Sequence, residues 1–263
     1  MSNGEPIRDQ GADSNESQPT SPPSSTTASS NDLSLSEDGA LALLKQADLA
    51  PEVIEQIVRS GSVLKYRKVK LALVEHPRTP RHLSVPLVRQ LFTFDLMHVA
   101  LTPTVPADLK RMADEALCTR LETISSGERL SLARRSSGHV AGALLRDSEA
   151  RVVHVALENP RLTESLVIKA VVNPKTPSHS VIAVCHHPQW SARREVRIAL
   201  LRSEKTPMAK AIEFARGLPP ALLREILHNS RLPHPIKSYL LHELGGAAHA
   251  REAQPRSSIR TFK

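Results

Sequence analysis

The chain of 263 residues contains few aromatic residues, few glycines and two cysteines. Aromatic residues make up 3% of the chain, whereas hydrophobic residues make up 40%, mostly Leu, Val, Ala and Ile. A composition of this kind favours helices over a β-sandwich or barrel, and its apolar content is sufficient for a substantial core. We therefore predict an all-α protein.

Long apolar runs and a framework of cysteines are also absent. Cys118 and Cys185 lie far apart within helical apolar patterns, which indicates neither a disulfide framework nor a metal-binding spacing. No uninterrupted apolar run approaches the roughly 20 residues of a membrane-spanning helix. The beginning, MSNGEPIRDQ, lacks the basic and apolar parts of a signal peptide. We therefore expect a soluble protein of the reducing cytoplasm, not associated with membranes.

Charge divides the chain unevenly. Residues 1–38 contain seven acidic residues and one basic residue, Arg8, which gives −6 for this segment and, by difference from the total of +8, +14 for the remainder. Residues 14–30 read SNESQPTSPPSSTTASS, and ordering such a segment costs conformational entropy that little burial offsets. We predict a disordered acidic arm rich in Ser, Thr and Pro over residues 1–34, which either accompanies or shields the basic body.

The middle of the chain repeats one turn pattern, in which an apolar helical stretch is followed by Asn or His, Pro, a basic residue, and Thr or Pro. The clearest copies are LALVEHPRTPRHL from Leu71, VALENPRLTESL from Val155, KAVVNPKTPSHSV from Lys169 and AVCHHPQWSARR from Ala183. Pro160, Pro174 and Pro188 are 14 residues apart, which fits one helix of about ten residues and a tight turn. Two such halves form a unit of about 28 residues, as in helical repeat proteins.

The turns fall into two interleaved series. One series contains Pro77, Pro103, Pro160 and Pro188, with a turn missing near residue 131, and the other contains Ser148, Pro174, Glu204 and Ser230. We predict a repeat domain over residues 35–245 and a flexible basic tail over residues 246–263, because Gly245 is expected to end the last helix.

The turn residues predict how one helix ends and the next begins. Because proline disfavours α conformation in the residue before it, helices should end at or before His76, Asn159, Asn173 and His187. These four residues share one position in the pattern, and we expect their side chains to bind free carbonyls at a helix end. The predicted N-caps are Thr79, Thr163, Thr176, Ser191 and Thr206. Prolines are expected in the first helical position at Pro80, Pro177 and Pro207.

These helix–turn–helix units resemble HEAT-like repeats and leucine-rich-repeat variants over most of residues 37–244. The segments LVEHPRTPRHLSVPLVRQLFTFDLMHVALTPTVPADLKRMADEAL and ALENPRLTESLVIKAVVNPKTP resemble uncharacterised bacterial HEAT-like proteins. The resemblance implies an α-solenoid of short antiparallel helix pairs forming a superhelix, and it implies no particular chemistry.

Basic clusters supply the candidate contacts with a partner or anion, namely Arg134, Arg135, Arg193, Arg194 and Arg197. Several basic helices placed side by side would create a positive face, although a solvated face without a specific partner is the alternative. Trp190, the single tryptophan, is either an apolar anchor across its turn or an exposed contact residue.

Catalytic and metal-binding motifs are lacking. The sequence contains no glycine-rich phosphate loop, nucleophile elbow or HExxH motif, and the consecutive residues of Cys185-His186-His187 diverge on a helix. We therefore expect no enzymatic activity, catalytic residue, cofactor or metal. The function we predict is a non-catalytic interaction scaffold that binds a protein partner through an extended solenoid surface. The alternative is nucleic-acid backbone binding through a basic face, since the scarcity of aromatic residues disfavours stacking on bases.

Overall fold

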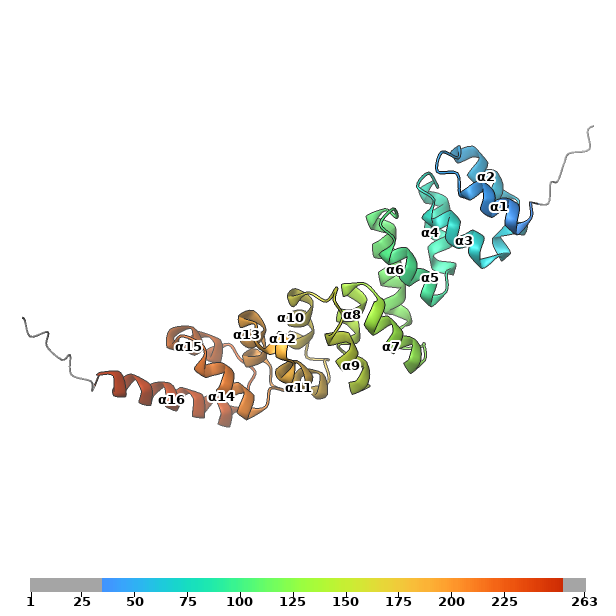
Figure 1. Cartoon of the computed structure of the whole chain (residues 1–263). Coiled ribbons are helices and arrows are strands. Elements are labelled where there is room, and N and C mark those ends of the chain that lie inside the picture. The colour runs from blue at the N-terminus through green and yellow to red at the C-terminus, as the bar shows by residue number, and fades with distance from the viewer. Residues whose placement is uncertain (1–34, 253–263) are drawn as a thin grey trace, which may run out of the picture. The chain divides into compact units, whose positions relative to one another are not determined.

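The computed structural model describes residues 35–252, with side chains up to Glu243. Every regular element in this range is a helix, as the composition predicts (Figure 1). The predicted arm, residues 1–34, and residues 253–263 of the predicted tail lie outside the described residues.

Sixteen α-helices and one short 3-10 helix follow one another in residues 35–252. They are α1 (Glu37–Leu44), α2 (Pro51–Arg59), η1 (Ser62–Lys65), α3 (Arg67–Glu75), α4 (Arg81–Gln90), α5 (Thr93–Leu101), α6 (Ala107–Arg120), α7 (Ser126–Arg135), α8 (Gly138–Leu144), α9 (Ala150–Leu157), α10 (Glu164–Val172), α11 (Ser178–His186), α12 (Pro188–Ser191), α13 (Arg194–Arg202), α14 (Met208–Arg216), α15 (Pro220–His228) and α16 (His234–Glu252).

The helices contact both their neighbours in sequence and the helices one unit away. Consecutive pairs include α3 with α4, α5 with α6, α7 with α8 and α13 with α14. Contacts between units join α4, α6, α8, α10, α13 and α15 in one series, and α7, α9 and α11 in another. This pattern of neighbouring pairs is compatible with a helical repeat.

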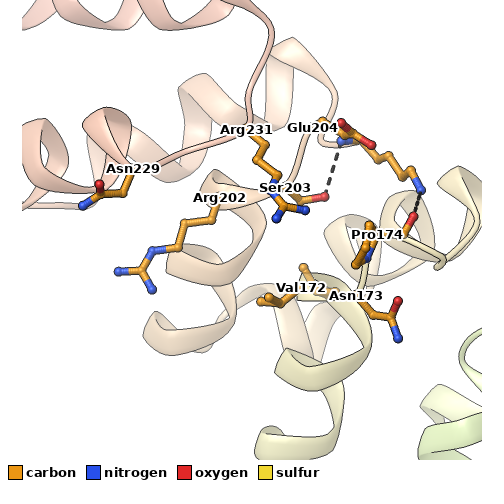
Figure 2. Close-up of a pocket in the computed structure, with 10 residues that line it drawn as sticks. Val172, Asn173, Pro174, Arg202, Ser203, Glu204, Asn229 and Arg231 are labelled. Atoms are coloured by element: carbon orange, nitrogen blue, oxygen red, sulfur yellow. Dashed lines mark hydrogen bonds between the residues drawn. The ribbon is translucent and has the colours of Figure 1, made fainter.

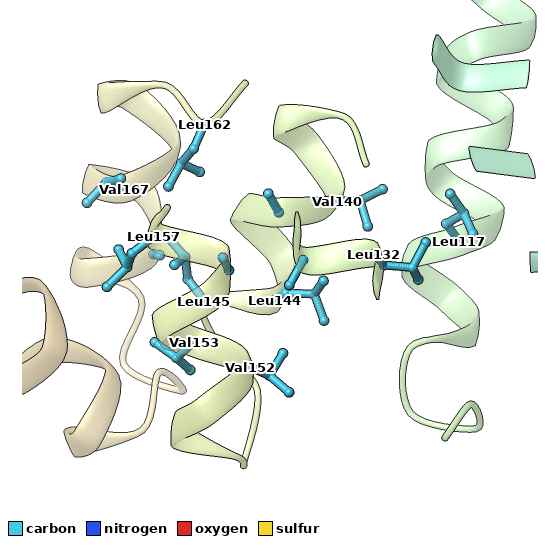
Figure 3. Packing of buried hydrophobic residues seen from close by; sticks show 14 of the residues in the cluster. Leu117, Leu132, Val140, Leu144, Leu145, Val152, Val153, Leu157, Leu162 and Val167 are labelled. Carbon is cyan, nitrogen blue, oxygen red and sulfur yellow. The ribbon is translucent and has the colours of Figure 1, made fainter. Parts of the chain in front are cut away.

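The core continues from one helix pair to the next. Figure 3 shows Leu132 of α7, Leu144 of α8, Val153 of α9 and Val167 of α10 within one cluster, and each is at most 1% exposed. Helices of this length are marginal by themselves in water, so their stability must come from this packing. In α11, Val181, Ala183, Val184 and Cys185 are all buried, so the apolar residues of this helix face several directions.

The residues before the turn prolines end their helices and also organise the turns. His76, Asn159 and Asn173 each accept a hydrogen bond from the backbone N–H two residues later, over 3.2, 2.8 and 2.9 Å respectively. This local bond is that of an Asx-type turn, with histidine replacing asparagine in one copy.

Side chains in these turns also bind the helix ends of the preceding unit. The Asn159 amide donates to the carbonyl oxygens of Ala133 and Ser136 over 2.8 and 3.3 Å, and His76 Nε2 lies 3.0 Å from the Gln46 carbonyl. The expected carbonyl binding is thus confirmed for these two residues. His187 instead faces the Glu158 carboxylate at 3.1 Å.

Other residue types make the same kind of contact between units. Trp190 Nε1 donates to the Leu157 carbonyl over 2.9 Å, and Lys205 Nζ donates to the Pro174 carbonyl over 2.7 Å. Arg120 donates to the Leu91 carbonyl over 2.6 Å. These partners are 33, 31 and 29 residues apart, close to the predicted unit of about 28 residues. These polar contacts, like the order of the helices, are compatible with a helical repeat.

The predicted N-caps at three of the turns are wrong by one residue. The N-cap positions belong to Pro80, Pro177 and Pro207, which have no side-chain cap. The preceding hydroxyls of Thr79, Thr176 and Thr206 each donate, over 2.6 Å, to the carbonyl six residues earlier. Threonine satisfies a free carbonyl of the helix that ends rather than an N–H of the helix that begins.

Three other local predictions also need correction. Ser191 ends α12, and Arg193 is the N-cap of α13. The helix α16 continues through Gly245 and Gly246 to Glu252, because the helix-forming residues on both sides tolerate two glycines that cost about 1 kcal/mol each relative to alanine. The turn missing near residue 131 lies between α7 and α8, where Ser136 and Ser137 replace the proline pattern.

Glycine at position 138 permits the close approach of α8 to the turn before α10. A Cβ atom on Gly138 would lie 2.1 Å from the Arg161 carbonyl oxygen, whereas one on Gly142 would lie 3.1 Å from Leu166 Cβ. A Cβ on Gly127 in α7 would meet nothing within 4 Å.

We predict that Gly138→Ala lowers the free energy of unfolding by about 3 kcal/mol, because the backbone of α8 or of the Arg161 turn must move. The matched replacement Gly127→Ala should raise it by about 0.5–1 kcal/mol through helix propensity. Urea unfolding of both variants measures the difference. Equal effects of the two replacements would contradict the packing described here.

We also predict that Asn159→Ala lowers the free energy of unfolding by about 1–3 kcal/mol, because it leaves two carbonyls in a buried site without their donor. Asn173→Ala removes the equivalent local turn bond but no bond to another unit, and should cost less than about 1 kcal/mol. The same unfolding measurement on both variants tests this. A larger loss for Asn173→Ala would show that the bonds between units contribute little.

Candidate functional site

A pocket between α7 and α9 collects three arginines. It has a volume of about 230 Å3 and is lined by Leu130, Ser131, Arg134, Arg135, Arg151 and Val155. We call it the arginine pocket. The side chains of Arg134, Arg135 and Arg151 are exposed, and none of them forms an ion pair with a carboxylate of the described residues. The sequence predicts the first two as contacts but not Arg151, which is separated from them by two turns.

The second predicted cluster lies elsewhere and is largely occupied by intramolecular contacts. Arg193 forms an ion pair with Glu164 at 3.0 Å, and its guanidinium lies 5.0 Å from the centre of the Trp190 ring. Arg197 Nε donates to the Ser191 carbonyl over 2.6 Å. Arg194 is exposed and does not line the pocket that contains Arg134 and Arg135. The structure thus does not bring the two predicted clusters into one pocket.

Trp190 is unavailable to a partner. Its side chain is 2% exposed, and its indole N–H is bonded to the Leu157 carbonyl. Of the two interpretations of this residue, the apolar anchor agrees with its position. We therefore leave Trp190 out of the candidate surface.

A second basic region follows the turns after α8, α10, α13 and α15. Three depressions there have volumes of about 490, 210 and 210 Å3. The first two share Ala143 and Arg146, and the last two share Asn173. They therefore form a continuous series of hollows across successive units.

Seven basic residues and three acidic residues line these hollows. Asp147 is paired with the poorly exposed Arg129 at 2.9 Å, and Lys205 is bonded to backbone carbonyls. Five cations have no carboxylate partner among the described residues, and together they define what we call the turn surface: Arg146, Lys169, Lys175, Arg202 and Arg231. The positive charge of this surface is therefore available for a ligand.

The turn surface also offers apolar and amide contacts. Figure 2 shows the hollow where Val172 and Asn173 lie near Arg202, Asn229 and Arg231. The Val172 side chain is 53% exposed although valine favours burial. A ligand in this hollow would meet an apolar group, amides and cations at once.

The sequence signal for this surface lies in residues one unit apart and not in runs of basic residues. Lys175, Lys205 and Arg231 all occupy the basic position of the second series of turns, 30 and 26 residues apart. Consecutive basic residues such as Arg193-Arg194 attract attention because they are neighbours in sequence. In a repeat, residues one unit apart are the ones brought together in space.

The described residues contain no group of three or more His, Cys, Asp or Glu side chains placed to hold a metal ion. Within the same range, no helix combines the length and the apolar character needed to cross a membrane.

The chain matches no model of a known protein family, and it has no significant match among curated proteins or solved structures. The resemblance to HEAT-like repeats therefore rests on the turn pattern and on the packing of neighbouring helix pairs.

Both thiols are protected from ionisation. Burial raises the pKa of Cys118 from 9.0 to about 11, and the nearby charge of Asp114 acts in the same direction. Burial likewise raises the pKa of Cys185 to about 11, and the Cys185 side chain has no exposed surface. Cys118 lines the largest of the three hollows, so the alkylation rate of its thiol can be used to probe that hollow.

We predict that iodoacetamide alkylates Cys118 in a Cys185→Ala variant about 100-fold more slowly at about pH 8 than a thiol of pKa 9.0, because the reactive thiolate is that much rarer. The rate should keep rising as the pH approaches 11. Alkylation followed by mass spectrometry measures it, with the urea-unfolded chain as control. A rate that levels off near pH 9 would contradict the assigned pKa.

Proposed function

We propose that the protein is a non-catalytic interaction scaffold, a HEAT-like α-solenoid of the cytoplasm that binds a protein partner along the turn surface. The observation that carries this proposal is the continuous series of hollows with five cations that have no carboxylate partner within residues 35–243. The ligand we propose is an acidic segment of the partner in extended conformation, because such a segment places side chains at regular intervals along successive units.

The mixed character of the hollows favours a peptide over a polynucleotide. The exposed Val172 and the amides of Asn173 and Asn229 suit alternating apolar side chains and backbone groups. Two of the acidic side chains that line the hollows, Glu122 and Glu204, are exposed and repel any anionic ligand. They therefore favour a segment whose carboxylates are separated by neutral residues over a backbone with consecutive phosphates. Aromatic platforms for bases do not line these three hollows.

Nucleic-acid backbone binding is the second candidate, and the same five cations favour it. A phosphate backbone binds chiefly through Lys and Arg, and its affinity falls steeply with salt. The two candidates therefore differ in their expected salt dependence as well as in their ligand.

We predict that replacing Lys169, Arg202 and Arg231 with Gln weakens binding of a labelled peptide of alternating Glu and Val or Ser residues by about tenfold or more at about 0.15 M salt, where long-range attraction is screened. The peptide should contain about fifteen residues, which span roughly 50 Å in extended conformation at about 3.3 Å per residue. Fluorescence anisotropy measures the affinity.

The matched control replaces Lys68, Arg194 and Arg224, which are exposed and outside the turn surface, and so removes the same charge. This control should change the affinity by less than about twofold, because its residues do not line the hollows and charges outside the site are screened at this salt concentration. Equal losses in both triple variants would contradict a specific surface. Tighter binding of duplex DNA than of the peptide, lost in the first variant alone, would establish the nucleic-acid alternative instead.

A further inference from the structure

The arginine pocket holds an excess of positive charge that nearby carboxylates do not neutralise. Each carboxylate on α7 or at the ends of α9 already has a partner. Glu128 completes the capping box with Ser125, Glu149 accepts from Ser126 and pairs with Arg129, and Glu158 faces His187. Arg134, Arg135 and Arg151 therefore share a small pocket without a counter-charge from the described residues around them.

The size and walls of the pocket limit the ligand. Its volume of about 230 Å3 is below the range of about 300–1,000 Å3 that holds whole small molecules, so it suits a single charged group. Leu130 and Val155 form an apolar wall beside the three guanidinium groups. A ligand with a short hydrocarbon stem and a strongly anionic head matches both parts.

A phosphate monoester fits this arrangement better than a carboxylate. Phosphate carries a charge of about −1.5 to −2 at neutral pH and three strong acceptor oxygens. Guanidinium groups pair with such oxygens through two parallel N–H donors, which fixes geometry as well as charge. Three arginines from two helices can supply donors to all three oxygens, whereas a carboxylate has only two oxygens and one charge.

The surroundings indicate one isolated phosphate rather than a polynucleotide. Helix α11, which packs against α9, reads SHSVIAVCH and contains neither Lys nor Arg. A nucleic-acid backbone presents phosphates at regular short intervals and needs a track of cations. A phosphorylated side chain presents one phosphate on a short stem.

We propose that the arginine pocket binds a phosphorylated Ser or Thr side chain of a protein partner. Arg134 and Arg151 approach from α7 and α9, and Arg135 completes the set. This site is separate from the turn surface, with which it shares no lining residue, so the partner can be recognised at two places.

The test compares three versions of one short labelled peptide, with phosphothreonine, threonine or glutamate at its centre. The phosphothreonine peptide should bind at least about tenfold tighter than the threonine peptide and tighter than the glutamate peptide, and inorganic phosphate should compete for it. Replacing Arg134, Arg135 and Arg151 together with Gln should abolish this preference. The corresponding triple Lys variant keeps the charge but loses the bidentate geometry, so it should retain only part of the preference.

The control variants are the two triple replacements described above. Both variants should keep the preference for phosphothreonine, including the variant that disables the turn surface. Failure of the proposal for the turn surface can therefore be distinguished from failure of the proposal for the arginine pocket. Circular dichroism and the unfolding temperature establish that each variant is folded. Variants with a single Gln replacement at Arg134, Arg135 or Arg151 allow the preference for phosphothreonine to be compared with a smaller change in the protein. Equal binding of the phosphothreonine and threonine peptides, an undiminished preference in the triple Gln variant, or stronger binding of duplex DNA by this pocket would overturn the proposal.

Discussion

Hydrogen bonds from turn side chains to the ends of helices in the preceding unit are the interaction on which the structure depends. Helices of eight to ten residues leave a large share of their carbonyls without an intrahelical partner. Asn159 and Trp190 bind such carbonyls from about one unit away, and Thr176 and Thr206 bind them within their own turns. Lys205 binds carbonyls of the turn one unit away. Apolar packing supplies most of the stabilisation. The hydrogen bonds determine which turn packs against which helix end.

The same constraint explains where the charges lie. Cations are favoured near helix C-termini because the carbonyls there carry partial negative charge. Lys205 joins two turns, whereas Lys169 and Arg202 lie in the last turns of α10 and α13, and Arg231 follows the end of α15 by three residues. These last three residues have no carboxylate partner among the described residues. A structural requirement thus leaves a row of cations facing solvent, and we propose that partner binding uses this row. The charge of the arginine pocket has a different origin, because the carboxylates on α7 and at the ends of α9 interact with other residues.

The helical class, the positions of most turns and the unit of about 28 residues could be predicted, because proline and the residue before it act locally. The role of Thr176 could not, since either neighbouring helix can use its hydroxyl and the fold decides between them. The turn at Ser136 and Ser137 was missed because it lacks proline and depends on Gly138 meeting the Arg161 turn. The candidate site was predicted only in part. Arg134 and Arg135 could be named, but Arg151 and the turn surface require knowledge of which units are adjacent.

Residue-resolved hydrogen exchange of the turn amides tests most directly whether side chains hold the turns in the conformation from which they bind the preceding unit. The backbone N–H groups of Arg161, Lys175 and Lys205 are bonded by the side chains of Asn159, Asn173 and Ser203, although the three residues lie outside helices. The turn amides of Ser148 and Glu204 have no such partner among the described residues. The account predicts that the first three exchange at least about tenfold more slowly than the last two. Exchange of all five at the rate of an unfolded chain would contradict it.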